Sequence, residues 1–154
     1  MKQPGNKTYG QLTCRVCLVR DRPPVEEIQL SSPDAVYCFV RDDLCSCDRE
    51  KLISILLTAK NTVIGVETVA VGTLDCCIIT PRELFKSAIL ANAHAIVICH
   101  NHPSGNPEPS SQDKDLTQNI KKAGEILAIE LRDHLIISDK GYYSFMAETA
   151  KEVM

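Results

Sequence analysis

Ala95-Ile96-Val97-Ile98-Cys99 is a continuous apolar run that leads directly into His100-Asn101-His102-Pro103. A strand that is apolar at every position, rather than at every second one, is typical of a strand covered on both faces. We therefore expect this strand in the middle of a sheet. Ligand sites in α/β folds lie beyond the carboxyl ends of strands, so the loop that begins at His100 is a candidate functional site.

Strand and helix signals alternate along the rest of the chain. Runs of β-branched residues predict strands, and a hydroxyl followed by proline predicts helix starts at Ser32-Pro33 and Thr80-Pro81, where Thr80 supplies the capping hydroxyl. The expected elements are, in chain order, strand 12–19, a helix from 33 to about 42, a hairpin of strands 52–57 and 63–71, strand 76–79, a helix from 81 to about 92, strand 95–99, helix 111–128, and strands 135–137 and 142–145. This order predicts one α/β domain with a mixed sheet and helices on its faces.

Length and composition are those of an ordinary single-domain protein. The chain has 154 residues, of which 44% are hydrophobic and 24% are charged, and its net charge is −3. These values exclude the disordered, collagen and coiled-coil classes. We expect a flexible terminus over residues 1–10 and one domain over residues 11–154. The chain has no excess of lysine and arginine, which nucleic-acid-binding proteins usually have. A nucleic acid is therefore a possible partner, but the composition does not support it.

The sequence predicts neither a membrane segment nor a secretion signal. No window approaches the roughly eighteen consecutive apolar residues of a membrane span. The first residues, Met1-Lys2-Gln3-Pro4, lack the apolar region of a signal peptide. We therefore expect a soluble, cytoplasmic protein without membrane contact.

Eight cysteines in a chain of this length raise the question of a disulfide framework or a zinc knuckle. The absence of a secretion signal and the ample apolar content argue against disulfides. Cys14 and Cys17 have knuckle spacing, but Cys45 and Cys47 have the wrong spacing for its second half. We expect most of these thiols to be small buried hydrophobic groups.

The paired histidines after the buried strand suit a metal ion. Side chains two positions apart in an extended backbone project to the same side, so His100 and His102 can converge while Asn101 points away. Pro103 favours the extended conformation at His102. Asp113 lies in the first turn of the next predicted helix, and the loop before it can fold back toward both rings. Two imidazoles and one carboxylate leave a fourth position open, which is the composition of a catalytic zinc site.

Two simpler interpretations stay open at this point. The histidines can be ordinary hydrogen-bonded loop residues. Ser110 and Asp113 have the spacing of a capping box, in which case they would only cap the start of the helix.

The whole stretch from His100 to Asp113, HNHPSGNPEPSSQD, resembles the JAMM signature H-x-H-P, six residues, S-x-x-D, in the form of the bacterial RadC family. Further residues stand where that family has them: Gly72-Thr73-Leu74, Pro81-Arg82-Glu83, Ala88 and Asp133-His134. The resemblance covers roughly residues 30 to 147. It implies a single MPN-type (JAB-like) domain with a deaminase-like three-layer α/β/α fold. It also implies a zinc ion held by His100, His102 and Asp113.

The resemblance implies a mechanism as well. JAMM enzymes hydrolyse peptide or isopeptide bonds with a zinc-activated water and a glutamate that opens the first hairpin strand. Glu50 occupies that place, and Glu67 on the return strand is the alternative. Ser110 would stabilise the oxyanion with its hydroxyl, unless it only caps the helix. The implied substrate is a peptide or a protein.

The chain also departs from the family pattern. Thr58 stands where aspartate is common, and His94 stands where alanine is common, so we expect His94 to be an ordinary residue and not a fourth ligand. Asp133-His134 is expected to support or pack against the site. Longer members have an N-terminal helix-hairpin-helix region, and we expect none in these 154 residues, which weakens an inference of DNA binding.

A second hypothesis belongs to a different functional class. The family name points to an accessory protein in DNA repair or mobile-element biology, in which zinc would only order a binding loop. An exposed hairpin edge would in addition permit a homodimer.

Overall fold

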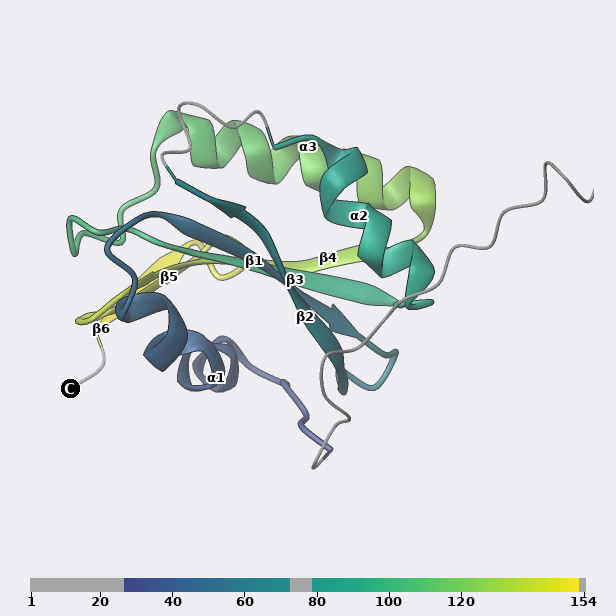
Figure 1. Cartoon of the computed structure of the whole chain (residues 1–154), viewed down its shortest axis with the longest axis horizontal. Coiled ribbons are helices and arrows are strands. Elements are labelled where there is room, and N and C mark those ends of the chain that lie inside the picture. The colour runs from purple at the N-terminus through teal and green to yellow at the C-terminus, as the bar shows by residue number, and fades with distance from the viewer. Residues whose placement is uncertain (1–26, 73–78, 153–154) are drawn as a thin grey trace, which may run out of the picture.

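A mixed sheet of six strands forms the middle layer of the molecule, with α1 on one face and α2 and α3 on the other (Figure 1). The computed structural model describes residues 27–72 and 79–152. The elements are α1 (Pro33–Cys45), β1 (Lys51–Leu57), β2 (Val63–Val71), α2 (Pro81–Leu90), β3 (Ala95–Asn101), α3 (Ser111–Leu127), β4 (Glu130–Ser138), β5 (Gly141–Ser144) and β6 (Thr149–Glu152). The predicted single α/β domain with a mixed sheet and three layers is confirmed.

The strand order is β2-β1-β3-β4-β5-β6, and of these neighbours only β3 and β4 are parallel. Every residue of β3 is buried, which confirms the prediction of a central strand covered on both faces. Its pairing with β1 sets Leu52 opposite His100. The start of β1 and the end of β3 therefore lie together at one edge of the sheet.

Alternate residues of the central strands pack into two separate cores. The core on the α1 face includes Val36, Leu44, Ile53, Ile55, Val97 and Leu135. The core on the face of α2 and α3 includes Leu56, Leu84, Phe85, Ile96, Ile98 and Ile120. His100 follows Ile96 and Ile98 on that second face, so the strand directs its imidazole toward α3.

Both predicted helix starts are correct in position, but only one hydroxyl caps its helix. The Ser32 hydroxyl accepts the Ala35 N–H at 3.2 Å. Thr80 takes the extended N-cap conformation, but its side chain makes no capping hydrogen bond, and its carbonyl oxygen instead accepts the Glu83 N–H at 3.1 Å. The predicted capping role of the Thr80 hydroxyl is wrong.

Helix ends differ by a few residues from their predicted positions. α1 continues to Cys45 rather than ending near residue 42, because Leu44 is still fully buried against the sheet. α2 ends at Leu90, since Asn92 adopts a left-handed backbone with φ of 51°. None of the helices in the described part of the chain is long and apolar enough to cross a lipid bilayer.

The strands of the C-terminal half are longer and more numerous than predicted. β4 begins at Glu130 rather than at residue 135, because buried Asp133 and His134 find hydrogen-bond partners inside the protein. β5 ends at Ser144, and β6 was not predicted. All four residues of β6 are exposed, so its sequence carries no apolar alternation, and it forms by pairing with β5.

Several expectations fall on residues that the structure does not describe. The flexible terminus over 1–10, the strand over 12–19, and all of the strand over 76–79 except Ile79 lie there. Ile79 itself belongs to no strand. Cys14, Cys17, Cys76 and Cys77 also lie outside the described residues.

The prediction that most cysteines are buried is wrong for three of the four described ones. All four are free thiols, but Cys38 and Cys45 are exposed, Cys47 is half-buried and only Cys99 is buried. The buried face of α1 is already occupied by larger side chains, namely Val36, Tyr37, Val40 and Leu44. The helix therefore turns Cys38 and Cys45 toward solvent.

Gly124 provides a test of how closely α3 packs on the start of β4. A Cβ at this position would collide with the carbonyl oxygen of Ile129 and lie 3.3 Å from the ring of Phe85. Overpacking of about 1–3 kcal/mol, occasionally more, outweighs the ~1 kcal/mol that alanine gains in helix propensity. We expect Gly124→Ala to lower the free energy of unfolding in urea. Gly65→Ala, which meets no atom within 4 Å, is the control, and an equal effect of both substitutions would contradict the packing argument.

Candidate metal centre

Ligand atoms of His100, His102 and Asp113 converge on one point at the carboxyl end of β3. The two Nε2 atoms lie 3.0 Å apart, and the carboxylate oxygens of Asp113 lie 3.2 Å from His100 Nε2 and 3.6 Å from His102 Nε2. Ligand atoms around a tetrahedral zinc ion are separated by about 3.3 Å, given bonds of about 2.0–2.1 Å. The three residues can therefore hold a metal ion. They are the one such group among the residues that the structure describes.

The end of β3 and the turn after it orient the second histidine. The His102 N–H donates to the carbonyl oxygen of Ile137 on β4 at 3.2 Å, and Gly105 N–H closes the turn on the His102 carbonyl at 2.9 Å. Gly105 has φ of 76°, a conformation that glycine tolerates best. His102 Nδ1 lies 2.7 Å from the carbonyl oxygen of Asn106, which can only accept. Nδ1 therefore carries a proton, and Nε2 faces the site.

Asp113 is held at the start of α3 by a capping box. Ser110 donates to Asp113 Oδ2 from its backbone N–H at 2.8 Å and from its hydroxyl at 2.6 Å. In return, Ser110 Oγ accepts the Asp113 N–H at 3.1 Å. The capping-box interpretation is thus confirmed, and it coexists with the cluster. Ser110 occupies one carboxylate oxygen, and the other, Oδ1, faces His100.

Charge within the cluster favours a cation. Asp113 is only 1% exposed, and this burial opposes ionisation, but hydrogen bonds from His100 and His102 outweigh it and hold the pKa of Asp113 well below its usual range. The pKa of His102 is raised chiefly by its hydrogen bond with Asp113. A buried carboxylate thus stays ionised between two imidazoles.

His134 lies behind the cluster, as expected for a supporting residue. Its Nε2 atom is 2.9 Å from His100 Nδ1, and its Nδ1 atom is 2.6 Å from the hydroxyl of Thr117. Its ring stacks on Phe145 at 4.7 Å with an interplanar angle of 9°. Burial lowers the pKa of His134 well below its usual value, so the ring is neutral.

Thr117 is the residue near the site that the sequence argument missed. Its hydroxyl donates to the carbonyl oxygen of Asp113 at 2.6 Å. The available signal was the spacing, because a threonine four positions after a ligand on a helix can donate back to that residue's carbonyl group.

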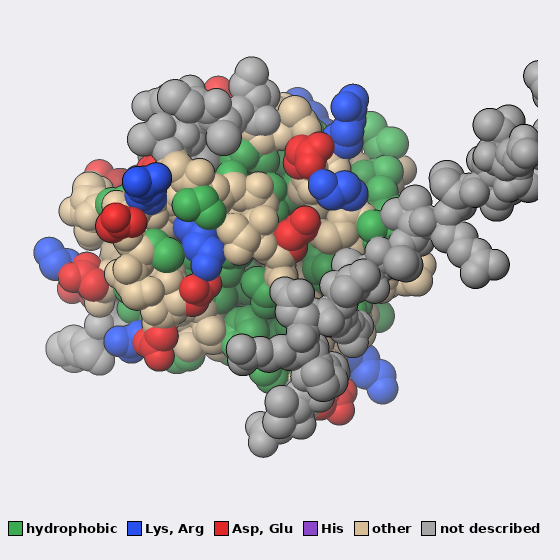
Figure 2. Space-filling view, viewed as in Figure 1, with side chains coloured by type: hydrophobic (Ala, Val, Ile, Leu, Met, Phe, Trp, Pro, Cys, Tyr) green, Lys and Arg blue, Asp and Glu red, His purple; other side chains and the backbone are tan. Residues whose placement is uncertain are grey.

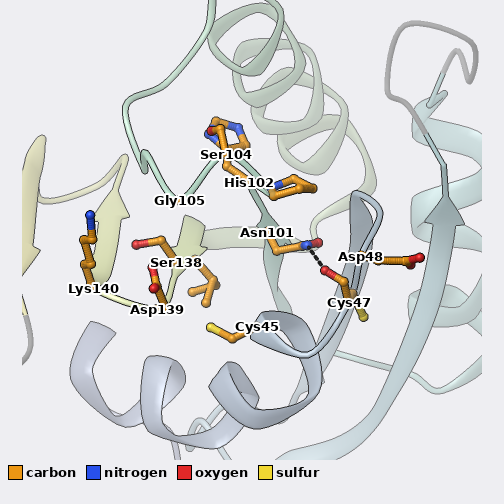
Figure 3. A pocket seen from close by; sticks show the side chains of 12 residues that line it. Cys45, Cys47, Asp48, Asn101, His102, Ser104, Gly105, Ser138, Asp139 and Lys140 are labelled. Carbon is orange, nitrogen blue, oxygen red and sulfur yellow. Dashed lines mark hydrogen bonds between the residues drawn. The ribbon is translucent and has the colours of Figure 1, made fainter.

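Asn101 points to the opposite face of β3, as predicted, and binds the segment before β1. Its Oδ1 atom accepts the Lys51 N–H at 2.7 Å, and its Nδ2 atom donates to the Arg49 carbonyl oxygen at 3.0 Å. Figure 3 shows its further hydrogen bond, to the Cys47 carbonyl oxygen. The side-chain amide of Asn101 thus binds the backbone of the residues on both sides of Glu50.

The structure places the two candidates for the general base differently. Glu50 directly precedes β1, and its charge adds to the larger effect of Asp113 in raising the pKa of His102. Glu67 lies on the outermost strand β2, opposite Ser54. Of the two carboxylates, Glu50 is therefore the one whose charge acts on the cluster.

A pocket of about 410 Å³ opens beside His102 (Figure 3). It lies between the end of α1, the loop after β3 and the turn from β4 to β5. Its polar lining residues include Asp48, Asn101, Ser104, Ser138, Asp139 and Lys140.

His94 is exposed and is not part of the cluster of His100, His102 and Asp113, as expected.

The coupling of His102 to Asp113 predicts the effect of one substitution. Asp113→Asn removes the negative charge that stabilises protonated His102, so the pKa of His102 should fall from its raised value toward or below the ordinary 6.5. The measurement is a histidine C–H titration by NMR on metal-free protein, with exposed His94 as internal reference. An identical His102 curve in both proteins would show that the pair does not interact.

Comparison with known proteins relates this geometry to a family. The family described as RadC-like JAB domain matches residues 30–151. The UPF0758 protein STH371 of Symbiobacterium thermophilum is 43% identical over 122 residues, which are 79% of this chain and 52% of that protein. A UPF0758 protein of Thermotoga maritima is 44% identical over 120 residues, 78% of this chain and 54% of that protein. The chain therefore spans about half the length of the curated relatives it matches. It belongs to the RadC-like JAB domain family.

Proposed function

We propose that this chain is a zinc-dependent hydrolase of peptide or isopeptide bonds. The observation that carries the proposal is the convergence of His100, His102 and Asp113 at the carboxyl end of a central strand. Three protein ligands leave one coordination position free, as in catalytic zinc sites. Zinc bound there would supply a Lewis acid and a water molecule of lowered pKa.

The donor set supports zinc over harder cations. Imidazole nitrogen is a ligand that zinc accepts readily, whereas calcium and magnesium prefer oxygen ligands throughout. Asp113 keeps Oδ1 toward His100 while Ser110 occupies Oδ2, so the carboxylate is presented through one oxygen. This arrangement supports a site with two nitrogen ligands and one oxygen ligand.

Glu50 is the proposed general base. A base in this role takes a proton from the attacking water and passes it to the leaving amine, and it must be held close to both. Asn101 binds the backbone on either side of Glu50, and the Gly72 N–H donates to the Glu50 carbonyl oxygen at 2.9 Å. These contacts support a fixed backbone position for Glu50, near the end of β3 that carries the histidines.

Ser110 has a defined task in the resting protein. Its hydroxyl proton is directed at Asp113 Oδ2, so it orients the carboxylate. Donation to a developing oxyanion would require the hydroxyl to leave Asp113 first. We therefore propose Ser110 as an oxyanion donor only during turnover.

The pocket beside His102 supports a peptide or protein substrate. It is open at the surface, and its lining offers both hydrogen-bond donors and acceptors, including Ser104, Ser138, Asp139 and Lys140. A peptide backbone needs both kinds of partner. We propose that residues flanking the cleaved amide bond occupy this pocket.

The alternative of an accessory nucleic-acid-binding protein has less support. Figure 2 shows acidic and basic side chains interspersed over the visible face, without a basic stripe. The net charge of the chain is −3. Nucleic-acid-binding surfaces concentrate lysine and arginine.

One experiment tests the metal and the base together. Glu50→Gln should keep about one zinc per chain, because Glu50 is not among the three ligands, but turnover should fall by about 10²–10⁴-fold, the usual contribution of general base catalysis. Glu67→Gln is the matched control and should keep both properties. Zinc would be measured by mass spectrometry on protein purified without a metal column, and hydrolysis on a peptide library.

Two outcomes would count against the proposal. Undiminished hydrolysis by Glu50→Gln would remove Glu50 from the role of base. A double substitution of His100→Ala and His102→Ala that still bound zinc would remove the metal from this site.

A further inference from the structure

A buried chain of hydrogen bonds connects two of the three proposed ligands behind the cluster. It runs from the Asp113 carbonyl oxygen to the Thr117 hydroxyl, then to His134 Nδ1, and from His134 Nε2 to His100 Nδ1, with distances of 2.6, 2.6 and 2.9 Å. The four residues are between 0% and 7% exposed. Their polar atoms therefore have to satisfy one another rather than water.

We propose that Thr117 and His134 are positioning residues that select the tautomer of His100 in which Nε2 is free to bind a metal. The inference rests on the proposed metal site and goes beyond it, since it assigns control of metal affinity to two residues that would not touch the metal. The argument follows the protons along the chain of hydrogen bonds.

The Asp113 carbonyl oxygen has no proton, and this sets the direction of its hydrogen bond with Thr117. A backbone carbonyl oxygen can only accept, so the 2.6 Å contact between the Asp113 carbonyl and Thr117 Oγ1 requires the hydroxyl proton to lie between them. A hydroxyl has one proton, so Thr117 can only accept from His134. His134 Nδ1, 2.6 Å away, therefore carries the proton of that ring.

The remaining bond then has one possible direction. A neutral imidazole has a single N–H, and His134 uses it toward Thr117, so His134 Nε2 accepts. The donor is His100 Nδ1, 2.9 Å away. When His100 is neutral, its lone pair is therefore on Nε2, the atom that lies 3.2 Å from Asp113 Oδ1 and 3.0 Å from His102 Nε2.

The opposite arrangement leaves one contact without a proton. If His100 carried its proton on Nε2, His134 would have to donate from Nε2 and accept from Thr117. The Thr117 hydroxyl would then turn away from Asp113, leaving two oxygen atoms 2.6 Å apart with no hydrogen between them. Such a contact is repulsive and lies away from the metal site. In the first arrangement the contacts without a proton are those of His100 Nε2 with His102 Nε2 and Asp113 Oδ1, at 3.0 and 3.2 Å, where a bound cation would lie between the atoms.

His102 also has its proton on Nδ1, but a different hydrogen bond places it there. His102 Nδ1 donates to the Asn106 carbonyl oxygen, which leaves the lone pair of His102 on Nε2. When both imidazoles are neutral, their Nε2 lone pairs lie beside an anionic carboxylate, as a divalent cation requires. Groups that orient metal-binding histidines in this way typically change metal affinity by 10–100-fold when they are replaced.

The first test observes the tautomers directly in the metal-free full chain. Two-bond ¹H–¹⁵N correlation spectra at neutral pH distinguish a protonated imidazole nitrogen from a bare one. We expect His134 to be protonated at Nδ1 only, and His100 to be protonated at Nδ1. Protonation of His134 at Nε2, or at both nitrogens, would overturn the proposal. This test does not require zinc to bind, so it stands even if the proposed function fails.

The second test measures zinc affinity by competition with a chelator. Thr117→Val keeps the shape of the side chain but removes the hydroxyl, and we expect zinc binding to weaken by about 10–100-fold. Thr117→Ser restores the hydroxyl and should restore the affinity. Ser54→Ala is the matched control, because it removes a fully buried hydroxyl on β1 that has no hydrogen-bond partner among the described residues.

The outcomes separate the two proposals. Wild-type zinc affinity in Thr117→Val would overturn the positioning role. Failure of the wild-type chain to bind zinc would overturn the proposed function, while the tautomers of His134 and His100 would still decide the positioning role. If Thr117→Val does not fold, the wild-type spectra provide the decision.

Discussion

The pairing of β3 with β1 on one side and with β4 on the other is the constraint on which the site depends. The antiparallel pairing with β1 brings the segment of Glu50 to the end of β3. The parallel pairing with β4 sets His134 opposite Ile98, so that its ring reaches His100. A shift of either pairing by one residue would turn these side chains to the other face of the sheet. The hydrogen bonds of the Asn101 side chain with the Lys51 N–H and the Arg49 carbonyl oxygen hold β3 in this register with β1.

The start of α3 supplies the other half of the geometry. Asp113 satisfies the end of the helix through Ser110 and at the same time turns its second oxygen toward His100. The positive end of the helix dipole favours a carboxylate in this first turn. The hydrogen bonds that cap the helix therefore also stabilise the buried carboxylate of Asp113. Thr117, one turn later, ties the backbone of the same residue to the histidines.

Local signals in the sequence predicted the parts of this structure that depend on neighbouring residues. The apolar run of β3 predicted its central place, and alternation predicted that His100 and His102 share a side while Asn101 points away. The three-residue cluster followed from spacing, and the family from the motif. These features depend on periodicity and turn chemistry, which the chain carries locally.

Features that depend on distant contacts were not predictable. β6 has four exposed residues and exists through its pairing with β5. One local prediction also failed, because the Thr80 hydroxyl makes no capping bond despite its favourable position. Asn101 obtains its role from partners that only the fold brings near, and so does Thr117 in its contact with His134. Sequence patterns can indicate that such polar residues are buried, but the direction of each hydrogen bond requires the three-dimensional arrangement.

The most direct test of the central claim is the zinc K-edge X-ray absorption spectrum of the zinc-loaded full chain. Coordination by His100, His102 and Asp113 predicts only nitrogen and oxygen scatterers at about 2.0–2.2 Å, with the outer-shell pattern of two imidazoles. A sulfur scatterer at about 2.3 Å would place the metal on cysteine thiolates and contradict the account.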